Sequence, residues 1–361
     1  MAEQVFFIPA RFDDPPDVWS SKIAALYERA ELGRTVTKND LVAIKLHFGQ
    51  PGNTCHLQPH HVKSLVDCVR AAEGKPFLTD TSTLYAGRRS NAVDYQMVAH
   101  EHGFTIERTG APVIMSDGLF GSAEIEVPIN GRDGRKVALA ADIVRTQACL
   151  VVTHVTGHCQ VGLGGVIKNV AMGTASRKGK LHQHSLAKPR IEPEECLACG
   201  ECAEWCPADA IVEADGASAM AIDDDRCIGC GECLTVCRNN AVKFDWKLGS
   251  AEMQRRMAEQ AAGLHHQKRG RIAYVSCLVN ITKDCDCIGK EGTVEIDDIG
   301  VLAGVAPLAV EQATLDLIRD RSGLDLCARY WPEIDPTLVL GHAASLGVGT
   351  TEYDLVEVKP H

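Results

Sequence analysis

The sequence predicts an α/β protein whose mainly parallel sheet with flanking helices is interrupted by a small inserted module. Apolar segments of strand length alternate with segments of helical periodicity on both sides of residue 189, which is typical of a parallel sheet with crossover helices. Eight of the sixteen cysteines fall between residues 189 and 247, where this alternation stops. We therefore expect two separate stretches of chain to complete one sheet.

The elements of the body follow in chain order from these local patterns. Before the insertion we expect strands at residues 5–9, 41–48, 76–80, 137–144 and 149–155, and helices at residues 17–32, 60–72 and 93–102. After it we expect an amphipathic helix at 250–266 that returns the chain, strands at 271–279, 293–302 and 354–359, and a helix at 308–321. The last strand is short and suits an edge of the sheet. The predicted units are residues 1–188 and 248–361 for the body and 189–247 for the insertion, which begins near Pro189 and Pro193.

Length, composition and charge limit the class of protein. With 361 residues, 45% hydrophobic and 24% charged, the chain resembles an ordinary globular protein with one large domain and one small one. The sequence has no apolar run of membrane-spanning length and no signal peptide at its start, so we expect no membrane association and a cytoplasmic location. The net charge of −11 disfavours nucleic-acid binding, which needs a basic surface.

The eight clustered cysteines form two copies of the pattern C-x2-C-x2-C-x3-C: Cys196, Cys199, Cys202 and Cys206, then Cys227, Cys230, Cys233 and Cys237. This is the ligand spacing of proteins with two [4Fe–4S] clusters, in which the fourth cysteine of each run binds the other cluster. We assign Cys196, Cys199, Cys202 and Cys237 to one cluster, and Cys227, Cys230, Cys233 and Cys206 to the other. Structural zinc sites use two C-x2-C pairs with a longer spacer, so zinc is the weaker alternative.

The insertion resembles bacterial-type two-cluster ferredoxins over residues 191–244. The resemblance implies a small α+β domain that carries single electrons. The sequence departs from it at Arg238, which stands where the first run has Pro207.

Polar residues follow several predicted strands of the body. Lys45 and His47 are two residues apart at the end of one strand and so share a face of it, and Asp80 follows the next strand. His158 comes shortly after the strand at 149–155. Because open α/β sheets bind ligands beyond the carboxyl ends of their strands, these side chains are candidates for one site.

A glycine-rich turn at residues 162–165 opens a predicted helix that carries Lys168. Such a turn at a helix N-terminus suits an anion or phosphate group. Its spacing matches neither a P-loop nor a dinucleotide fingerprint. The alternative is a tight turn packed against the sheet.

Cys285 and Cys287 share a loop with Asp284 and Asp286. Either thiol could ligate a metal, and together with His158 or His184 they would form an additional mononuclear site. The alternative is a solvated loop with reduced thiols. The remaining cysteines stand singly in apolar segments and are expected to lie in the core: Cys55, Cys68, Cys149, Cys159, Cys277 and Cys327.

Four long stretches of the chain resemble the DUF362 family: IKLHFGQPGNT, FLTDTSTLYAGRRSNAVDY, GHCQVGLGGVIKNVAMGTASRKGKLHQH and ITKDCDCIG. The resemblance extends over nearly the whole chain, and members with this ferredoxin insertion occur in anaerobic bacteria and archaea. It implies an iron–sulfur protein, but no particular reaction, because the name marks a family without an established function.

Three functions are compatible with these features. In the first, a redox enzyme, the clusters pass electrons between a redox protein partner and a second site that binds an anionic small molecule. Its catalytic candidates are Lys45, His47, Asp80, His158, Lys168 and His184, with the two lysines binding the anion and a histidine supplying protons. In the second, the body docks a partner enzyme or helps to assemble its metal centre, and in the third the clusters are structural. Polar loops that converge on an enclosed pocket would favour the first function over the second.

Overall fold

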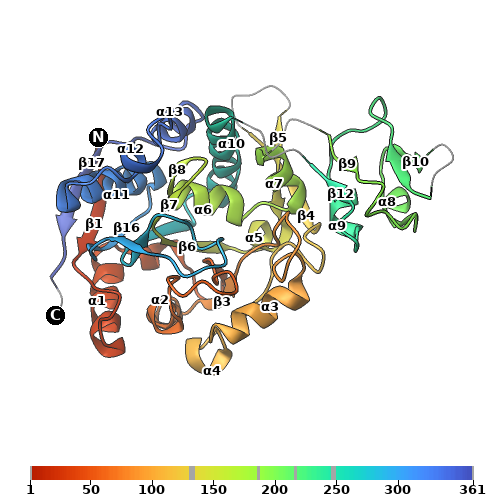
Figure 1. Cartoon of the computed structure of the whole chain (residues 1–361). Helices are drawn as coiled ribbons and strands as arrows, with labels where there is room; N and C mark the ends of the chain where they lie inside the picture. Colours follow the sequence, from red (N-terminus) through yellow and green to blue (C-terminus); the bar gives the residue numbers. More distant parts are fainter. Residues whose placement is uncertain (1, 130–134, 185–187, 215–217, 245–248, 360–361) are drawn as a thin grey trace.

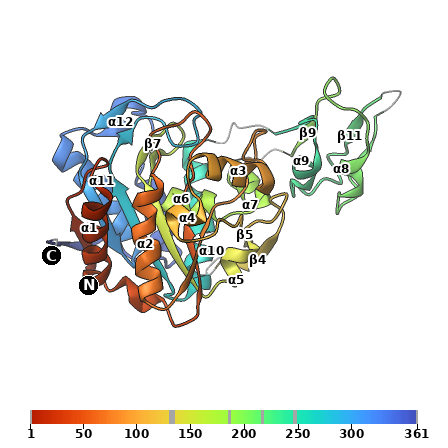
Figure 2. The ribbon, with the colours of Figure 1, turned by 90° about the horizontal axis from the view of Figure 1, so that it is seen from below.

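The computed structural model describes residues 2–129, 135–184, 188–214, 218–244 and 249–359. The body is built around a seven-stranded sheet, and residues 188–244 form a smaller unit that extends to one side of it (Figures 1 and 2). Residues 185–187 and 245–248 lie outside the described ranges. The predicted end of the insertion, at residue 247, falls among them, whereas its predicted start, at residue 189, is described. No described helix is both long and apolar enough to cross a lipid bilayer.

The central sheet confirms the predicted fold class. Its strand order is β17-β1-β16-β13-β6-β2-β3. The strands are β1 (Glu3–Ile8), β2 (Leu41–Lys45), β3 (Lys75–Thr79), β6 (Ala148–His154), β13 (Ile272–Leu278), β16 (Gly300–Gly304) and β17 (Tyr353–Glu357). All neighbours pair in parallel except β16, which is antiparallel to both β13 and β1. The last strand, β17, lies at an edge as expected, and β13 pairs with β6 across the insertion.

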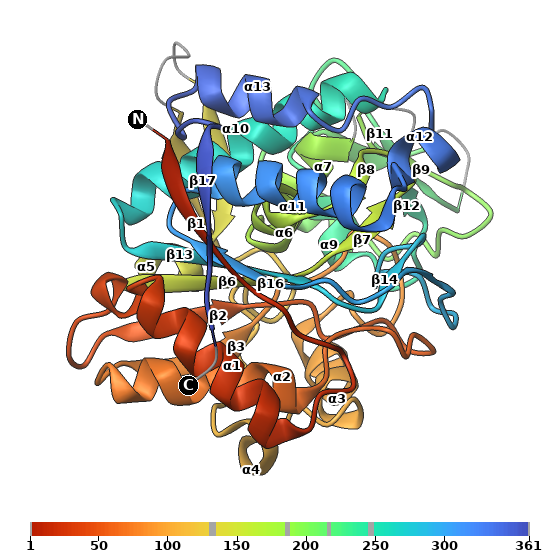
Figure 3. The same ribbon diagram turned by 90° about the vertical axis from the view of Figure 1, so that its left-hand side faces the viewer.

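Helices cover both faces of this sheet and make three layers (Figure 3). One face carries α1 (Pro16–Arg29), α2 (Pro59–Ala71), α3 (Ala92–Glu101) and α4 (Ile106–Thr109), with the short helix η1 (Leu32–Thr35) after α1. The other carries α6 (Val166–Gly173), α10 (Ser250–Lys268), α11 (Pro307–Ser322) and α13 (Leu338–Ser345), with α12 (Leu326–Tyr330) nearby. Successive strand residues point to opposite faces, so Val5 and Phe7 pack in one core while Phe6 and Ile8 pack in the other.

Two predicted strands differ from the structure. Residues 137–144 divide into β5 (Lys136–Ala140), which pairs with β4 (Glu124–Pro128) outside the main sheet, and the helix α5 (Ala141–Arg145). A short apolar run does not by itself distinguish strand from helix. Residues 293–302 divide into β15 (Val294–Ile296), which pairs with β14 (Ile281–Thr282), and β16. Asp298 separates the two because its carboxylate accepts the backbone N–H groups of Phe12 and Asn280, at 2.7 and 2.6 Å.

The smaller unit has its own core and its own hairpins. Its elements are β9 (Arg190–Ile191), α8 (Glu201–Glu204), β10 (Ile211–Glu213), β11 (Met220–Ile222), α9 (Glu232–Val236) and β12 (Val242–Lys243). β9 pairs with β12, so the chain enters and leaves at neighbouring points, and β10 pairs with β11. Leu84 and Leu181 of the body pack into the core of this unit. Leu181 belongs to α7 (Arg177–His184), which lies beside α9 (Figure 1).

Candidate functional site

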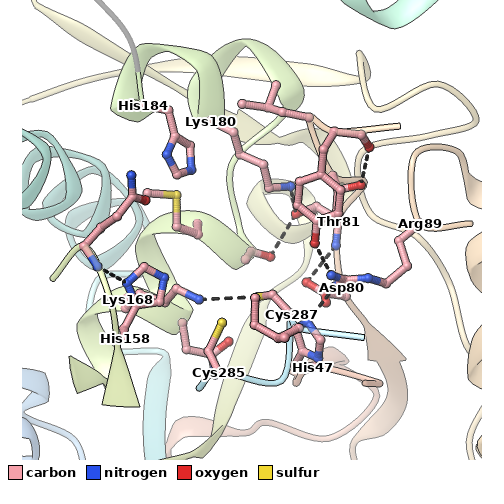
Figure 4. A pocket seen from close by; sticks show the side chains of 18 of the residues that line it. His47, Asp80, Thr81, Arg89, His158, Lys168, Lys180, His184, Cys285 and Cys287 are labelled. Carbon is pink, nitrogen blue, oxygen red and sulfur yellow. Dashed lines mark hydrogen bonds between the residues drawn. The ribbon is translucent and has the colours of Figure 1, made fainter. Parts of the chain in front are cut away.

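A cavity of about 260 Å³ lies at the carboxyl ends of β2, β3 and β6 (Figure 4). It is lined by all six residues that the sequence nominated as catalytic: Lys45, His47, Asp80, His158, Lys168 and His184. Cys285 and Cys287 line it too. The polar loops therefore converge on one pocket, as parallel strands would bring them, while the catalytic roles of these residues stay predictions. Cys159 also lines the cavity and is exposed, so its expected place in the core is wrong.

Lys45 and Asp80 form a buried ion pair at the base of the cavity. The Lys45 side chain is 1% exposed, and its Nζ lies 3.1 Å from Oδ1 of Asp80. The same ammonium donates to Oδ1 of Asn169 at 2.7 Å and to the carbonyl of Leu46 at 3.0 Å. An ammonium has three N–H donors, and all three are engaged. Lys45 thus organises the site instead of binding an external anion as we predicted.

Asp80 is held in its charged form by the groups around it. Burial, the largest single effect, acts to raise the pKa of this carboxyl, but Lys45, His47, the Tyr95 hydroxyl and Lys180 together outweigh it and lower the pKa overall. The hydroxyl of Tyr95 donates to Oδ2 of Asp80. Sequence analysis missed Tyr95, which stands on α3 as one apolar residue among several.

Two further cations of the cavity wall were also missed. Arg89 is 2% exposed; its guanidinium lies 2.6 Å from Nε2 of His47 and donates to Gln50 and Tyr85. Lys180, on α7, donates to Oγ1 of Thr81 at 2.5 Å, and also to the carbonyls of Ser82 and Ala175. Burial lowers the pKa of Lys180 to about 8. Both residues stand among other polar residues without a spacing pattern, and the one signal was that they lie in the stretches that resemble the DUF362 family.

The two histidines on the far wall are neutral at pH 7. Burial lowers the pKa of His158 to about 3 and that of His184 to about 4, and the Lys168 ammonium adds to both effects. A neutral imidazole can accept a proton or offer a hydrogen bond. The predicted role of proton donor is therefore disfavoured for these two side chains at neutral pH.

The Cys285–Cys287 loop is fixed by its middle residue. Asp286 turns away from the two thiols, and its Oδ2 lies 2.9 Å from Nδ1 of His154 at the end of β6. The N–H of Ile288 donates to the carbonyl of Cys285 at 2.9 Å, which closes a tight turn. Lys168 Nζ lies 3.6 Å from Sγ of Cys287. The hydrogen bond from Cys285 lowers the pKa of Cys287, and Lys168 lowers it further.

We expect the substitution Lys168→Gln to slow alkylation of Cys287 by iodoacetamide about ten-fold or more at neutral pH. The thiolate reacts and the thiol does not, and loss of the ammonium removes one of the charges that stabilise the thiolate. The measurement is the rate at which the tryptic peptide 284–290 gains the label, with Lys22→Gln, in an ion pair remote from the cavity, as control. Equal rates in wild type and Lys168→Gln would show that this ammonium does not set the reactivity.

The glycine-rich turn is not an open anion site, because a carboxylate of the protein already lies there. Oε2 of Glu311, on α11, accepts the backbone N–H groups of Val166 and Ile167 at 2.5 and 3.4 Å, at the first residues of α6. A Cβ at Gly165 would collide with this carboxylate. The helix N-terminus is thus capped from within, and the alternative of a tight structural turn is the correct one.

Glu311 should make the protein less stable as pH rises through neutrality. Burial raises the pKa of this carboxyl to about 7, so between pH 5 and 8 the folded state must give up a proton that the unfolded state has already lost. Relative to Glu311→Gln, wild type should lose about 2–3 kcal/mol of unfolding free energy over that range. Urea denaturation of both proteins at pH 5 and 8 measures the difference, with the exposed Glu28→Gln as control. A pH-independent difference between wild type and Glu311→Gln would contradict the assignment.

The cysteines of the smaller unit gather in two groups that mix the two runs. A narrow cavity is lined by Cys196, Cys199 and Cys202 of the first run and by Cys237 of the second. Burial raises the pKa of Cys233 to about 12, and four thiols add to this effect: Cys230 and Cys227 of its own run, and Cys202 and Cys206 of the first. The first group is the predicted ligand set of one cluster, and the thiols near Cys233 include the predicted set of the other. The binding of clusters by these thiols stays a prediction.

Backbone groups around these thiols fit a cluster as well. N–H groups point at sulfur from Met220 to Cys196 at 3.3 Å, from Ala210 to Cys206 at 3.3 Å and from Ala241 to Cys237 at 3.2 Å. N–H···S bonds are one of the means by which proteins tune iron–sulfur clusters. The last two bonds reach four residues along the chain from the fourth cysteine of each run, so the runs are alike in structure as well as in spacing.

Across the described part of the chain, no three His, Cys, Asp or Glu side chains are arranged to hold a single metal ion. The described residues therefore bring neither His158 nor His184 to Cys285 and Cys287 as a third ligand. A cubane cluster places its thiolates around four irons, so its ligand set need not converge on one point.

Comparisons with known proteins identify the family of the chain. A model of the family described as "Domain of unknown function (DUF362)" matches residues 42–316. None of the curated proteins matches the chain. Two solved structures are similar in part: a protein from Thermotoga maritima (8% identity, TM-score 0.42) and the lactate racemase apoprotein from Thermoanaerobacterium thermosaccharolyticum (10%, TM-score 0.36). The alignments cover 86% and 75% of this chain, but only 59% and 50% of those two.

Proposed function

The chain belongs to the DUF362 family, and on this premise we propose that it is an iron–sulfur oxidoreductase. Two [4Fe–4S] clusters in residues 188–244 would be held by the two mixed groups of four cysteines, and an anionic small molecule would bind in the cavity of the body. When bound, such clusters supply single electrons, at potentials that the protein sets.

The observation that carries the proposal is the wall shared by the cysteine unit and the cavity. Leu84 lines the cavity and also packs in the same core as Cys202 and Cys233. Nη2 of Arg177 donates to the carbonyls of Leu84 and Leu234, at 3.3 and 3.0 Å, and so joins the cavity loop to α9. A simple electron carrier has no need of a cavity lined by buried charged side chains beside its cysteines.

The contact favours the group that contains Cys233 as the one nearer the body. A Cβ at Gly231 would lie 2.7 Å from the side chain of Leu181, so glycine is required where α9 meets α7. In Figure 1, α9 faces the body while α8 and β10 lie farther out. Electrons that enter at the outer end would therefore meet the Cys233 group last.

The charges that line the cavity favour an anionic ligand. The wall carries four cations, Lys45, Lys168, Lys180 and Arg89, against the two carboxylates of Asp80 and Asp284. Lys45 and Lys180 are saturated by internal acceptors. Lys168 makes one hydrogen bond within the described structure, to Cys287, and so keeps donors for a carboxylate or phosphate group.

Anaerobic purification with iron, sulfide and zinc analysis tests the proposal. We expect about eight irons and eight sulfides per chain, and EPR signals of two clusters after reduction. Zinc in place of iron, or iron well below one cluster per chain, would contradict it.

One observation favours the second function, a module that docks a partner. Leu197, Trp205 and Ile228 on the cysteine unit are 72%, 50% and 67% exposed, and apolar surface of this kind suits a protein partner. The two functions are separated by Lys168→Gln. A docking module would retain its full electron transfer with this substitution in the cavity, whereas an enzyme would lose turnover.

A further inference from the structure

The cavity contains two sulfur atoms for which the proposed function so far gives no use. Cys285 and Cys287 both line the cavity, and both are thiols. They occupy the first and third positions of the turn closed by the Ile288 N–H, and such a turn brings their Cα atoms within the range that a disulfide bridges. The backbone of this turn is therefore compatible with a disulfide between the two residues.

The conformation of the Cys285–Cys287 loop is fixed by hydrogen bonds of the two aspartates that flank Cys285. Asp286 is fixed by His154, whose Nε2 lies 2.9 Å from the carbonyl of Val279. The backbone N–H of Gln50 donates to the carbonyl of Asp286 at 3.1 Å, and Oγ1 of Thr282 to the carbonyl of Asp284 at 2.7 Å. A loop fixed in this way keeps the two sulfurs on the cavity side.

The two thiols also differ in their pKa and in their surroundings, as do the cysteines of pairs that exchange with disulfides. Cys285 is 8% exposed, and its pKa is raised well above the usual range by its hydrogen bond to Cys287 and by burial. Cys287 lies beside the Lys168 ammonium and favours the thiolate. The first is suited to resolve a mixed disulfide, and the second to attack.

We propose that Cys285 and Cys287 form a redox-active dithiol–disulfide pair, which reduces small disulfides that carry anionic groups. The cavity, of about 260 Å³, has the size for a small molecule, and its cationic wall favours negative charge. The reductant is the reduced iron–sulfur protein, so this part of the inference rests on the proposed function.

Atoms and electrons balance in two half-reactions. In the first, the Cys285–Cys287 bond breaks, two electrons and one proton are taken up, and the products are the Cys285 thiol and the Cys287 thiolate. In the second, the Cys287 thiolate attacks one sulfur of the substrate and releases a substrate thiolate. Cys285 then gives up its proton to solvent and displaces the second substrate thiolate from Cys287, which restores the protein disulfide.

Thiol trapping tests the pair directly. The full-length protein is equilibrated anaerobically in mixtures of reduced and oxidised dithiothreitol, quenched with acid, alkylated and digested with trypsin. The peptide 284–290 contains both cysteines. We expect it to change reversibly, as a two-electron couple, between two forms. One is the doubly alkylated peptide, and the other is an unalkylated disulfide peptide, which is lighter by two hydrogen atoms than the reduced, unlabelled peptide. Two alkylated cysteines at every ratio would overturn the proposal, as would a cross-link to the peptide of Cys159.

Variants and two probe disulfides complete the test. Cys285→Ser and Cys287→Ser should each abolish the transition, and Cys159→Ser should leave it intact. Reduced protein should be oxidised by 3,3′-dithiodipropionate, an anion, about ten-fold faster than by cystamine, a cation, and equal rates would overturn the anionic class. Iron is measured on the same samples. A disulfide transition without iron would defeat the proposed function but not the pair, and clusters without the transition would defeat the pair but not the function.

Discussion

Alanine at Cys237 should remove the same iron–sulfur cluster as alanine at Cys199, although the two residues belong to different runs. Both line the narrow cavity of the outer group. Loss of one thiolate from a four-cysteine site should release about half of the iron and eliminate one of two EPR signals. Cys206→Ala and Cys230→Ala should eliminate the other signal. The measurement is EPR of the four variants after anaerobic reduction, together with iron content.

The control is Cys68→Ala, a half-buried thiol on α2 that should retain both signals. If Cys237→Ala and Cys230→Ala instead eliminated one and the same signal, each run would hold its own cluster, and the mixed assignment would be wrong. The variants also test the order of the clusters. Loss of the Cys230 group should impair electron delivery to the cavity more than loss of the outer group, because α9, which carries Cys233 of the same group, contacts α7.

The second large effect is expected at Lys45. Lys45→Met should lower the free energy of unfolding by about 3–5 kcal/mol, because it leaves the buried Asp80 carboxylate without its cation. Chemical denaturation measures this loss. The double variant Lys45→Met/Asp80→Asn should recover most of it, since the asparagine carries no charge and still accepts the Tyr95 hydroxyl. Lys63→Met, which breaks an exposed pair with Asp67, should cost less than about 0.5 kcal/mol.

The pH dependence should change sign in this variant. In wild type the pKa of Asp80 is lowered, so its contribution to stability is present above the unfolded pKa and is lost as pH falls. Without Lys45, burial dominates and the folded pKa is raised, so that acidification should stabilise Lys45→Met relative to wild type. A difference between the two proteins that stays constant with pH would mean that another group compensates for the missing ammonium.

The parts of the site that the sequence predicted are those set by local spacing and by one rule of topology. Ligand runs of cysteine are read within eleven residues of chain, and residues such as Lys45 and Asp80 converge because parallel strands end at the same edge of a sheet. The contacts that decide which hydrogen bonds and charges these residues have come from far along the chain. Asn169 is 124 residues from Lys45, and Glu311 is 145 residues from Val166. No pattern near the glycine turn could show that a carboxylate of α11 would cap it.

The elements of the fold were also predictable where local patterns set them. Strands with a continuous apolar run and helices with a clear period were found within a few residues. The first failure was 137–144, a short apolar run that divides between a strand and a helix. The second was 293–302, where Asp298 separates two strands. The N–H groups that its carboxylate accepts lie 286 and 18 residues away, so no local pattern shows the break.

The pairing of β13 with β6 has a consequence for how the chain folds as it is synthesised. Residues 155–271, with the whole cysteine unit, are made between these two adjacent strands. At 5–20 residues per second, β6 keeps an open edge for roughly 6–25 s while the insertion emerges. The cysteine unit can therefore leave the ribosome before the sheet of the body has closed.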